Sequence, residues 1–260
     1  MQSKHAYFTL VSHNWLLGAE TLIKSLRAQN TTRPIEVMVL PDVSDNDMSK
    51  LAALGATCNR VESIKSKLAI VKPWHKSPDF CQNCFCKLHM WNTNYDKIIY
   101  LDADTIVIKN IDHLFYTQEE FAAGRSCTSI INVKTNESQS FLNDNHFNAG
   151  VLVFSPNKKT YKDLMEQKDY VNDDDGSDQS LLNIYFKHTW YKLPVIYNTT
   201  QRLKSSLPQV WKQIKEDIHV IHYTLHKPWA TKDNTELNSL WWRWYNYRGI
   251  TNEPSPGNGT

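Results

Sequence analysis

The sequence has no apolar run close to the roughly 18–20 residues that a membrane-spanning helix requires, so we expect no membrane span. It also has no marked excess of either charge, because 29 Lys and Arg residues balance 27 Asp and Glu residues to a formal net charge of +2. Nucleic-acid-binding domains usually carry a strongly basic surface, and this balance argues against one. What remains is the composition of an ordinary globular protein, with an apolar fraction of 41%.

Glycine is scarce, at eight of 260 residues, and no glycine-rich phosphate-binding motif follows the first predicted strand. A dinucleotide-dependent dehydrogenase or a P-loop enzyme is therefore not indicated. Cysteine is also scarce and odd in number, at five. The first strand is predicted from about Tyr7, which leaves no room for a secretory signal before it. We therefore expect unpaired thiols and a reducing, cytoplasmic location.

Strands and helices are predicted to alternate along the chain. The predicted strands are 7–12, 35–40, 57–61, 98–101, 151–154 and 220–222, and the predicted helices are 18–29, 45–54, 84–92, 157–167, 180–186 and 235–247. This alternation is typical of an α/β protein with a Rossmann-like, mostly parallel sheet flanked by helices. We expect one domain over residues 1–249 and a disordered tail over 250–260.

The most informative stretch is the apolar segment Ile98–Leu101 followed by Asp102, Ala103 and Asp104. The segment is short and rich in β-branched and aromatic residues, which is typical of a buried strand in a parallel sheet. Ligands of open α/β sheets bind beyond the carboxyl ends of the strands, so both carboxylates are expected to face a cleft. They repel each other unless a cation lies beside them, and their oxygens suit Mg²⁺ or Mn²⁺. The alternative is a turn that simply ends the strand.

Two further polar groups lie at the ends of predicted elements. Asp178 and Gln179 precede the predicted helix at 180–186, where acidic and amide residues also serve as ordinary caps. His222 ends the predicted strand at 220–222, and Lys227 follows five residues later. Taken alone, these positions do not distinguish a ligand-binding role from a structural one.

The segment Cys81-Gln-Asn-Cys84-Phe-Cys86 contains half of a typical zinc site. The other two cysteines are far away in the sequence, and a histidine would have to complete the site. Core or loop thiols are therefore favoured over a zinc centre.

Short motifs are distributed along most of the chain. They are Thr9-Leu10, Gly18-Ala19, Leu40-Pro41-Asp42, Lys87-Leu88, Tyr100-Leu101-Asp102-Ala103-Asp104, Asn110-Ile111-Asp112-His113-Leu114-Phe115, Phe147-Asn148-Ala149-Gly150, Asp178-Gln179, and His222 with Lys227-Pro228-Trp229. In this order and spacing, from about Tyr7 to Trp229, the sequence resembles glycosyltransferase family 8, the glycogenin and galactinol-synthase group of retaining enzymes. The resemblance implies a single GT-A domain, and it overturns the turn interpretation of the Asp-Ala-Asp segment.

The resemblance implies a metal and a UDP-sugar donor. Asp102, Asp104 and His222 match the family's metal ligands, and this mixture of carboxylates and imidazole suits Mn²⁺, with Mg²⁺ as the other candidate. Lys227 matches a lysine that contacts the donor pyrophosphate, and Leu225 lies in the same phosphate-binding loop. The catalytic candidates are Lys87, Asp178 and Gln179, with Lys87 near the donor sugar and phosphate.

The same resemblance implies the rest of the donor pocket. Leu10, Ser12 and Trp15 lie where the family holds uridine, and Trp15 replaces a stacking tyrosine while preserving an aromatic face. Small Ala103 allows the donor to approach the backbone. The sugar pocket is matched by Asn148, Ala149, Asp175, Asp178 and Gln179.

Gln179 is expected near the anomeric carbon, where an amide is a weak nucleophile. A front-face mechanism with an oxocarbenium-like transition state and UDP as the base is therefore favoured over a covalent intermediate. The sequence departs from the family's pattern in two loops. The segment from His222 to Lys227 is one residue short and has Leu225 and His226 where a glycine is usual, and the first loop is also one residue short.

Two classes of function follow from the resemblance. The first is Mn²⁺-dependent transfer of a hexose, glucose or galactose, from a UDP-sugar to a hydroxyl of a glycan, polyol or other acceptor. The second is a non-catalytic relative that binds a nucleotide-sugar or glycan. The intact set of Asp102, Asp104, His222 and Lys227 favours the enzyme. A homodimer is left open.

The resemblance also bears on the acceptor. Glycogenin glucosylates one of its own tyrosines, a few residues before a Leu-Pro pair. Here the pair is Leu207-Pro208, the preceding segment has no tyrosine, and Lys204 occupies the acceptor position. An ammonium offers no hydroxyl, so a separate acceptor is favoured over self-glycosylation at another tyrosine or at a serine such as Ser205.

Overall fold

The computed structural model describes residues 4–66, 83–132, 137–170, 177–224, 226–231 and 233–248. Its centre is a seven-stranded sheet with the order β3-β2-β1-β4-β7-β6-β8. In that order the strands span Thr57–Arg60, Ile35–Val39, His5–Val11, Lys97–Leu101, Glu137–Phe154, Phe121–Asn132 and Tyr191–Leu193. β3, β2, β1 and β4 run parallel, which confirms the predicted α/β fold with a mostly parallel sheet. The predicted tail at 250–260 lies outside the described residues.

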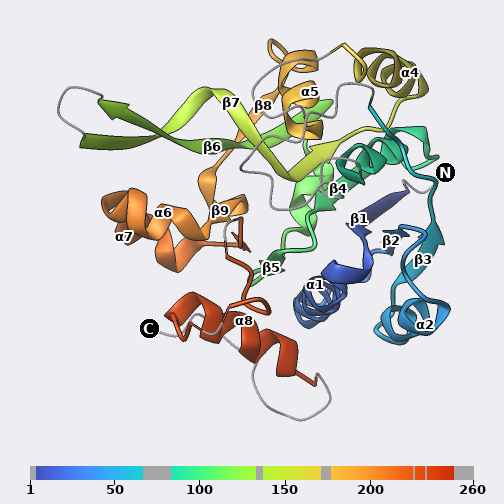
Figure 1. Cartoon of the computed structure of the whole chain (residues 1–260), viewed down its shortest axis with the longest axis horizontal. Helices are drawn as coiled ribbons and strands as arrows, with labels where there is room; N and C mark the ends of the chain where they lie inside the picture. The colour runs from blue at the N-terminus through green and yellow to red at the C-terminus, as the bar shows by residue number, and fades with distance from the viewer. Residues whose placement is uncertain are drawn as a thin grey trace.

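Helices flank the sheet (Figure 1). They are α1 (Leu16–Ala28), α2 (Asp45–Ala53), η2 (Cys84–Asn92, a 3-10 helix), α4 (Lys158–Gln167) and α5 (Asp178–Tyr185). Ile99 and Leu101 of β4 pack with residues of α1 and α2, whereas Ile98 and Tyr100 pack with residues of η2, α4 and α5. Successive side chains of a strand point to opposite faces, so β4 contributes to two cores. This explains why its sequence is apolar without interruption.

The β6–β7 ribbon differs from the prediction. The sequence predicted only 151–154, but β7 extends from Glu137 to Phe154 and is antiparallel to both β4 and β6. Figure 1 shows the ribbon projecting far beyond the rest of the sheet. Residues 134–146 contain only two apolar residues, the adjacent Phe141 and Leu142, so the period-two pattern of a packed strand is absent.

A second sheet of three short strands brings distant parts of the chain together. Its order is β5 (Thr105–Val107), β10 (Val220–His222) and β9 (Thr199–Thr200). β10 is antiparallel to β5 and parallel to β9, and its register pairs His222 with Thr105 and Thr200. The other helices of the described residues are η1 (His13–Trp15), η3 (Asp112–Tyr116), η4 (Val195–Tyr197), α6 (Gln201–Ser206), α7 (Pro208–Ile214), η5 (Lys215–Asp217) and α8 (Glu236–Asn246).

α8 supports this second sheet. Its buried face includes Leu240, Trp241 and Trp244, which form one core with Ile106 of β5 and Ile221 of β10. The helix therefore contributes packing. Within the described ranges, we find no helix with both the length and the apolar character of a membrane span.

The thiols of η2 also belong to a core. Cys84 and Cys86 are buried, and Cys86 Sγ accepts a hydrogen bond from the Ile64 N–H at 3.2 Å. Burial raises the pKa of the Cys86 thiol, which favours its neutral form. These contacts support a packing role, whereas Cys81 lies outside the described residues.

Candidate active site

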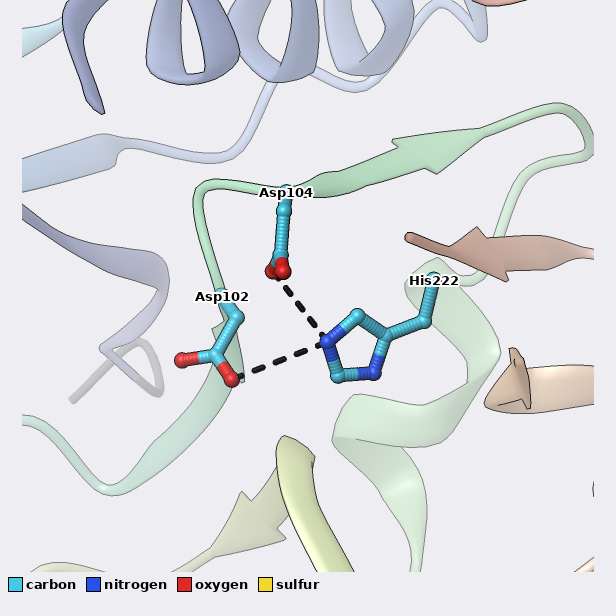
Figure 2. Close-up of side chains that lie close together, drawn as sticks. All are labelled: Asp102, Asp104 and His222. Carbon is cyan, nitrogen blue, oxygen red and sulfur yellow. Dashed lines mark ion pairs between the residues drawn. The ribbon is translucent and has the colours of Figure 1, made fainter. Parts of the chain in front are cut away.

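Asp102, Asp104 and His222 form a compact cluster (Figure 2). Asp102 follows β4, Asp104 precedes β5, and the pairing of β10 with β5 places His222 beside them. His222 Nε2 lies 3.1 Å from Asp104 Oδ1 and 3.8 Å from Asp102 Oδ2. One potential ligand atom from each residue lies within 4.8 Å of the others. Two carboxylates and an imidazole that converge in this way fit Mn²⁺ or Mg²⁺ by donor chemistry.

Gly150 leaves room for this cluster. Its carbonyl accepts a hydrogen bond of 2.8 Å from the Asp102 N–H. A Cβ at this position would lie 2.0 Å from His222 Cε1 and 2.9 Å from Asp102 Oδ2. No side chain fits there, so the glycine of the Phe-Asn-Ala-Gly motif is explained by close approach to the candidate metal ligands.

Lys227 is the cation nearest to Asp104 in this structure. Its Nζ forms an ion pair with Asp104 Oδ2, donates to the Tyr223 carbonyl at 2.6 Å, and lies 5.0 Å from the centre of the Trp15 ring. Burial tends to raise the pKa of Asp104, but the positive charge of Lys227 and the close contact with His222 outweigh it and lower that pKa. Asp104 is therefore held ionised, ready to bind a cation.

Lys87 is buried beneath the same cluster. Its Nζ lies 2.7 Å from Asp178 Oδ2 and 3.3 Å from Asp102 Oδ1, and it donates to the Ala149 carbonyl at 3.2 Å. Burial opposes the charged ammonium, but Asp102 and Asp178 outweigh burial and raise the pKa of Lys87. Lys87 therefore stays protonated and holds the carboxylate of Asp102, a candidate metal ligand, close to that of Asp178, a predicted sugar-pocket residue.

Tyr100 fixes the orientation of Asp102 from below. Its hydroxyl donates to Asp102 Oδ1 at 2.6 Å, and its ring lies 4.7 Å from Lys87 Nζ. Burial and then the charge of Asp102 raise the pKa of Tyr100 well above its usual value, so the hydroxyl remains a donor. With Oδ1 bound in this way, Oδ2 is the oxygen that faces His222.

The sugar-pocket candidates form a set of amide hydrogen bonds. Gln179 Oε1 accepts from Asn148 Nδ2 at 3.2 Å and from the Ala149 N–H at 3.0 Å. Asn148 Oδ1 accepts from the Gly150 N–H at 3.0 Å and from Asn198 Nδ2 at 2.9 Å. The structure thus brings Asn148, Ala149 and Gln179 together beside the metal-ligand cluster.

Asn198 is a site residue that the sequence analysis missed. It precedes the two-residue strand β9, and its side chain is 2% exposed and contacts both Asn148 and His222. An asparagine between short irregular elements is usually a turn residue, so no local pattern separated it from many others.

The uridine candidates lie at the end of β1. Leu10 is in β1, Ser12 follows it, and half-buried Trp15 ends η1. The Trp15 ring packs edge-on against Trp229 at a centroid distance of 5.8 Å and lies beside the Lys227 ammonium. Trp15 and the Lys-Pro-Trp motif are therefore neighbours, while Asp175 and Leu225 lie outside the described residues.

Solved glycosyltransferases share this architecture. The apo form of GlyE from Streptococcus pneumoniae TIGR4 aligns over 95% of this chain and 61% of its own, with a TM-score of 0.68 and 22% identity. The galactosyltransferase LgtC, in complex with donor and acceptor sugar analogues, aligns over 92% of this chain and 95% of its own, with a TM-score of 0.66 and 17% identity. At these identities the comparison shows the fold alone, which is the GT-A fold of glycosyltransferases.

The chain belongs to glycosyl transferase family 8, whose sequence profile it matches over residues 7–233. It is 30% identical over 237 residues to the Putative UDP-glucuronate:xylan alpha-glucuronosyltransferase 5 of Arabidopsis thaliana, 31% over 264 residues to Glycogenin-1 of Caenorhabditis elegans, and 27% over 286 residues to Galactinol synthase 4 of Arabidopsis thaliana. These alignments cover 90%, 95% and 94% of this chain. They span 38% and 58% of the first two relatives and 81% of the third.

Proposed function

We propose that this chain is a Mn²⁺-dependent retaining glycosyltransferase that transfers a neutral hexose from a UDP-sugar to a hydroxyl of a separate acceptor. The observation that carries the proposal is the convergence of Asp102, Asp104, His222 and Lys227 in one cluster. A divalent cation held by the first three residues would supply the Lewis acid that stabilises departing UDP. A relative that only bound glycans would have no need for metal and phosphate ligands together.

The residues around the cluster support a front-face reaction. The Gln179 Oε1 atom already accepts two hydrogen bonds, and Asp178 Oδ2 forms an ion pair with Lys87, so neither group is placed as a strong nucleophile. In the proposed step the bond from the anomeric carbon to UDP breaks and a bond to the acceptor oxygen forms on the same face. The acceptor proton passes to the departing phosphate, and Lys227 contributes positive charge there.

The charges in the pocket favour a neutral donor sugar. Some relatives are named for UDP-glucuronate, whose sugar carries a carboxylate. Among the described residues, the Lys87 ammonium is neutralised by Asp102 and Asp178, and the groups that donate to Gln179 Oε1 are the Asn148 amide and the Ala149 N–H. Lys87 is then unavailable to pair with a sugar carboxylate, which would be buried without a counter-charge, so glucose or galactose is the better match. Release of UDP from a panel of UDP-sugars with Mn²⁺, including UDP-glucuronate, tests both the activity and this preference.

We expect Trp15 to contact the uracil ring, because it lies beside Lys227 at the end of β1. Replacing Trp15 with alanine should weaken UDP binding by roughly 1–2 kcal/mol, which is roughly 5- to 30-fold in Kd. Titration calorimetry with UDP and Mn²⁺ measures this change, and tryptophan fluorescence of the wild type should decrease on binding. Trp242→Ala on α8 is the matched control and should bind UDP normally; an unchanged Kd for Trp15→Ala would place the uridine elsewhere.

A separate acceptor is proposed because Lys204 lacks a hydroxyl. Lys204 lies in α6, forms an ion pair with Glu236 and lies 5.6 Å from the Trp211 ring centre, so it is engaged in packing. After incubation with UDP-glucose and Mn²⁺, the intact mass of the protein should therefore be unchanged, and UDP release should rise when an acceptor is supplied. A ladder of hexose increments on the protein would instead show self-glycosylation, and peptide mapping would identify the residue.

We also propose a reducing, cytoplasmic site of action, which the free thiols of Cys58, Cys86 and Cys127 support.

A further inference from the structure

A continuous chain of side-chain amides connects the candidate metal site to the sugar pocket. His222 Nδ1 is 3.0 Å from Asn198 Oδ1, Asn198 Nδ2 donates to Asn148 Oδ1, and Asn148 Nδ2 donates to Gln179 Oε1. We propose that Asn198 is a positioning residue that sets both ends of this chain. It would hold His222 in the form that binds metal through Nε2, and it would hold Gln179 with its N–H groups available to the sugar. This inference rests on the proposed function.

The direction of every bond follows from two backbone donors. The Gly150 N–H can only donate, so the Asn148 atom that it contacts must be the carbonyl oxygen. Asn198 must then present its NH₂ group to that oxygen, and its own carbonyl oxygen faces His222. An oxygen acceptor requires a proton on His222 Nδ1, which leaves Nε2 as the ligand atom facing Asp104.

The orientation of Gln179, at the sugar end of the amide chain, is fixed in the same way. The Ala149 N–H donates to Gln179 at 3.0 Å, so the Gln179 atom in this contact must be Oε1. That oxygen also accepts from Asn148 Nδ2. The part of the amide left for a ligand is the NH₂ group, which donates hydrogen bonds. Gln179 would therefore recognise a sugar hydroxyl or ring oxygen as an acceptor.

Asn198 is held tightly enough to control these orientations. It is 2% exposed, and a Cβ on neighbouring Gly124 would lie 2.9 Å from Asn198 Cβ. Gly124 thus allows β6 to approach Asn198 closely. A buried side chain with both polar atoms engaged has little freedom to rotate, and partners of metal-binding histidines commonly fix their tautomer and ring orientation.

Two substitutions test the metal end and the sugar end of the amide chain separately. Asn198→Leu keeps the branching of the side chain but removes both hydrogen bonds, so it should weaken Mn²⁺ binding by about 10- to 100-fold, the usual cost of losing such a partner. Asn198→Asp keeps an acceptor for His222 but cannot donate to Asn148. Its Mn²⁺ affinity should therefore be retained, while kcat falls by about tenfold or more because the Gln179 amide is no longer oriented.

The Mn²⁺ affinity is measured from the free-ion electron paramagnetic resonance signal, and kcat is measured by UDP release. Asn183→Leu is the matched control, because Asn183 is also buried but bonds to the backbone of Phe147 and Gln179. It should lower thermal stability without changing Mn²⁺ affinity. A folded Asn198→Leu protein with wild-type Mn²⁺ affinity would overturn the inference at the metal end. An Asn198→Asp protein with wild-type kcat would overturn it at the sugar end.

If Asn198→Leu does not fold, Asn198→Asp decides, because its shape is nearly that of asparagine. Retained Mn²⁺ affinity together with a reduced kcat supports the inference. Any other combination of these two results contradicts it. Failure of the proposed function looks different: the wild type itself would then release no UDP from any UDP-sugar, whatever its Mn²⁺ affinity.

Discussion

Asp104→Ala should lower sugar transfer by at least about a hundredfold, because the pyrophosphate charge is then uncompensated as its bond to the sugar breaks. Asp102→Ala and His222→Ala should have effects of the same order, since all three side chains converge on one position. Asp104→Ala also removes the partner of Lys227, leaving that ammonium without its carboxylate. Steady-state UDP release at saturating donor, with Mn²⁺ varied, measures the loss.

The control for these variants is Asp217→Ala, which removes an exposed carboxylate in η5. It should transfer sugar at the wild-type rate. Thermal unfolding of each variant separates loss of activity from loss of folding. Near-normal turnover in a folded Asp104→Ala protein would refute the metal-site assignment.

Gly150→Ala should be almost as damaging, although it removes no ligand. The new methyl group would lie 2.0 Å from His222 Cε1, 2.6 Å from His222 Nδ1 and 2.9 Å from Asp102 Oδ2. Relieving this overlap must move the imidazole or the carboxylate, and a shift near 1 Å at a reacting site costs about a hundredfold in rate. We therefore expect about a hundredfold less transfer, together with much weaker Mn²⁺ binding.

Gly55→Ala is the matched glycine substitution. Gly55 has φ of 86° at the end of α2, and a Cβ there would meet the Arg27 side chain at 3.2 Å. It should cost about 1 kcal/mol of stability without affecting Mn²⁺ binding. If Gly150→Ala binds Mn²⁺ like Gly55→Ala does, the close packing of Gly150 against His222 is not important for the metal site.

Much of the site was predictable because its residues lie at the ends of locally recognisable elements. Ile98–Leu101 is buried on both faces, so its apolar composition predicted β4 and placed Asp102 and Asp104 beyond its end. The resemblance of the Phe-Asn-Ala-Gly motif to the family's pattern predicted Asn148 and Ala149 near the sugar. The role of Gly150 was not predicted, because it depends on the position of His222, which is distant from Gly150 in the sequence.

The ribbon and the amide chain show where local pattern was insufficient. The outer part of β7 is polar and has no period-two alternation, so only its last four residues were predicted as a strand. Asn198 contacts His222 and Asn148, which are 24 and 50 residues away along the chain. Contacts at such separations leave no mark on the neighbouring sequence.

By itself the sequence determined the α/β class and the central strand, because burial and alternation are properties of short segments. The prediction of Asp102 and Asp104 as metal ligands came from the resemblance to family 8 and not from these local patterns. Only the tertiary structure decided how these parts combine. Pairing of β10 with β5 brings His222 to Asp104, burial of Lys87 unites Asp102 with Asp178, and Asn198 connects the two halves of the site. These contacts form by strand pairing and side-chain burial between segments that are distant in the sequence. Hydrogen bonds depend on distance in space and not on distance along the chain, so local sequence patterns do not predict them.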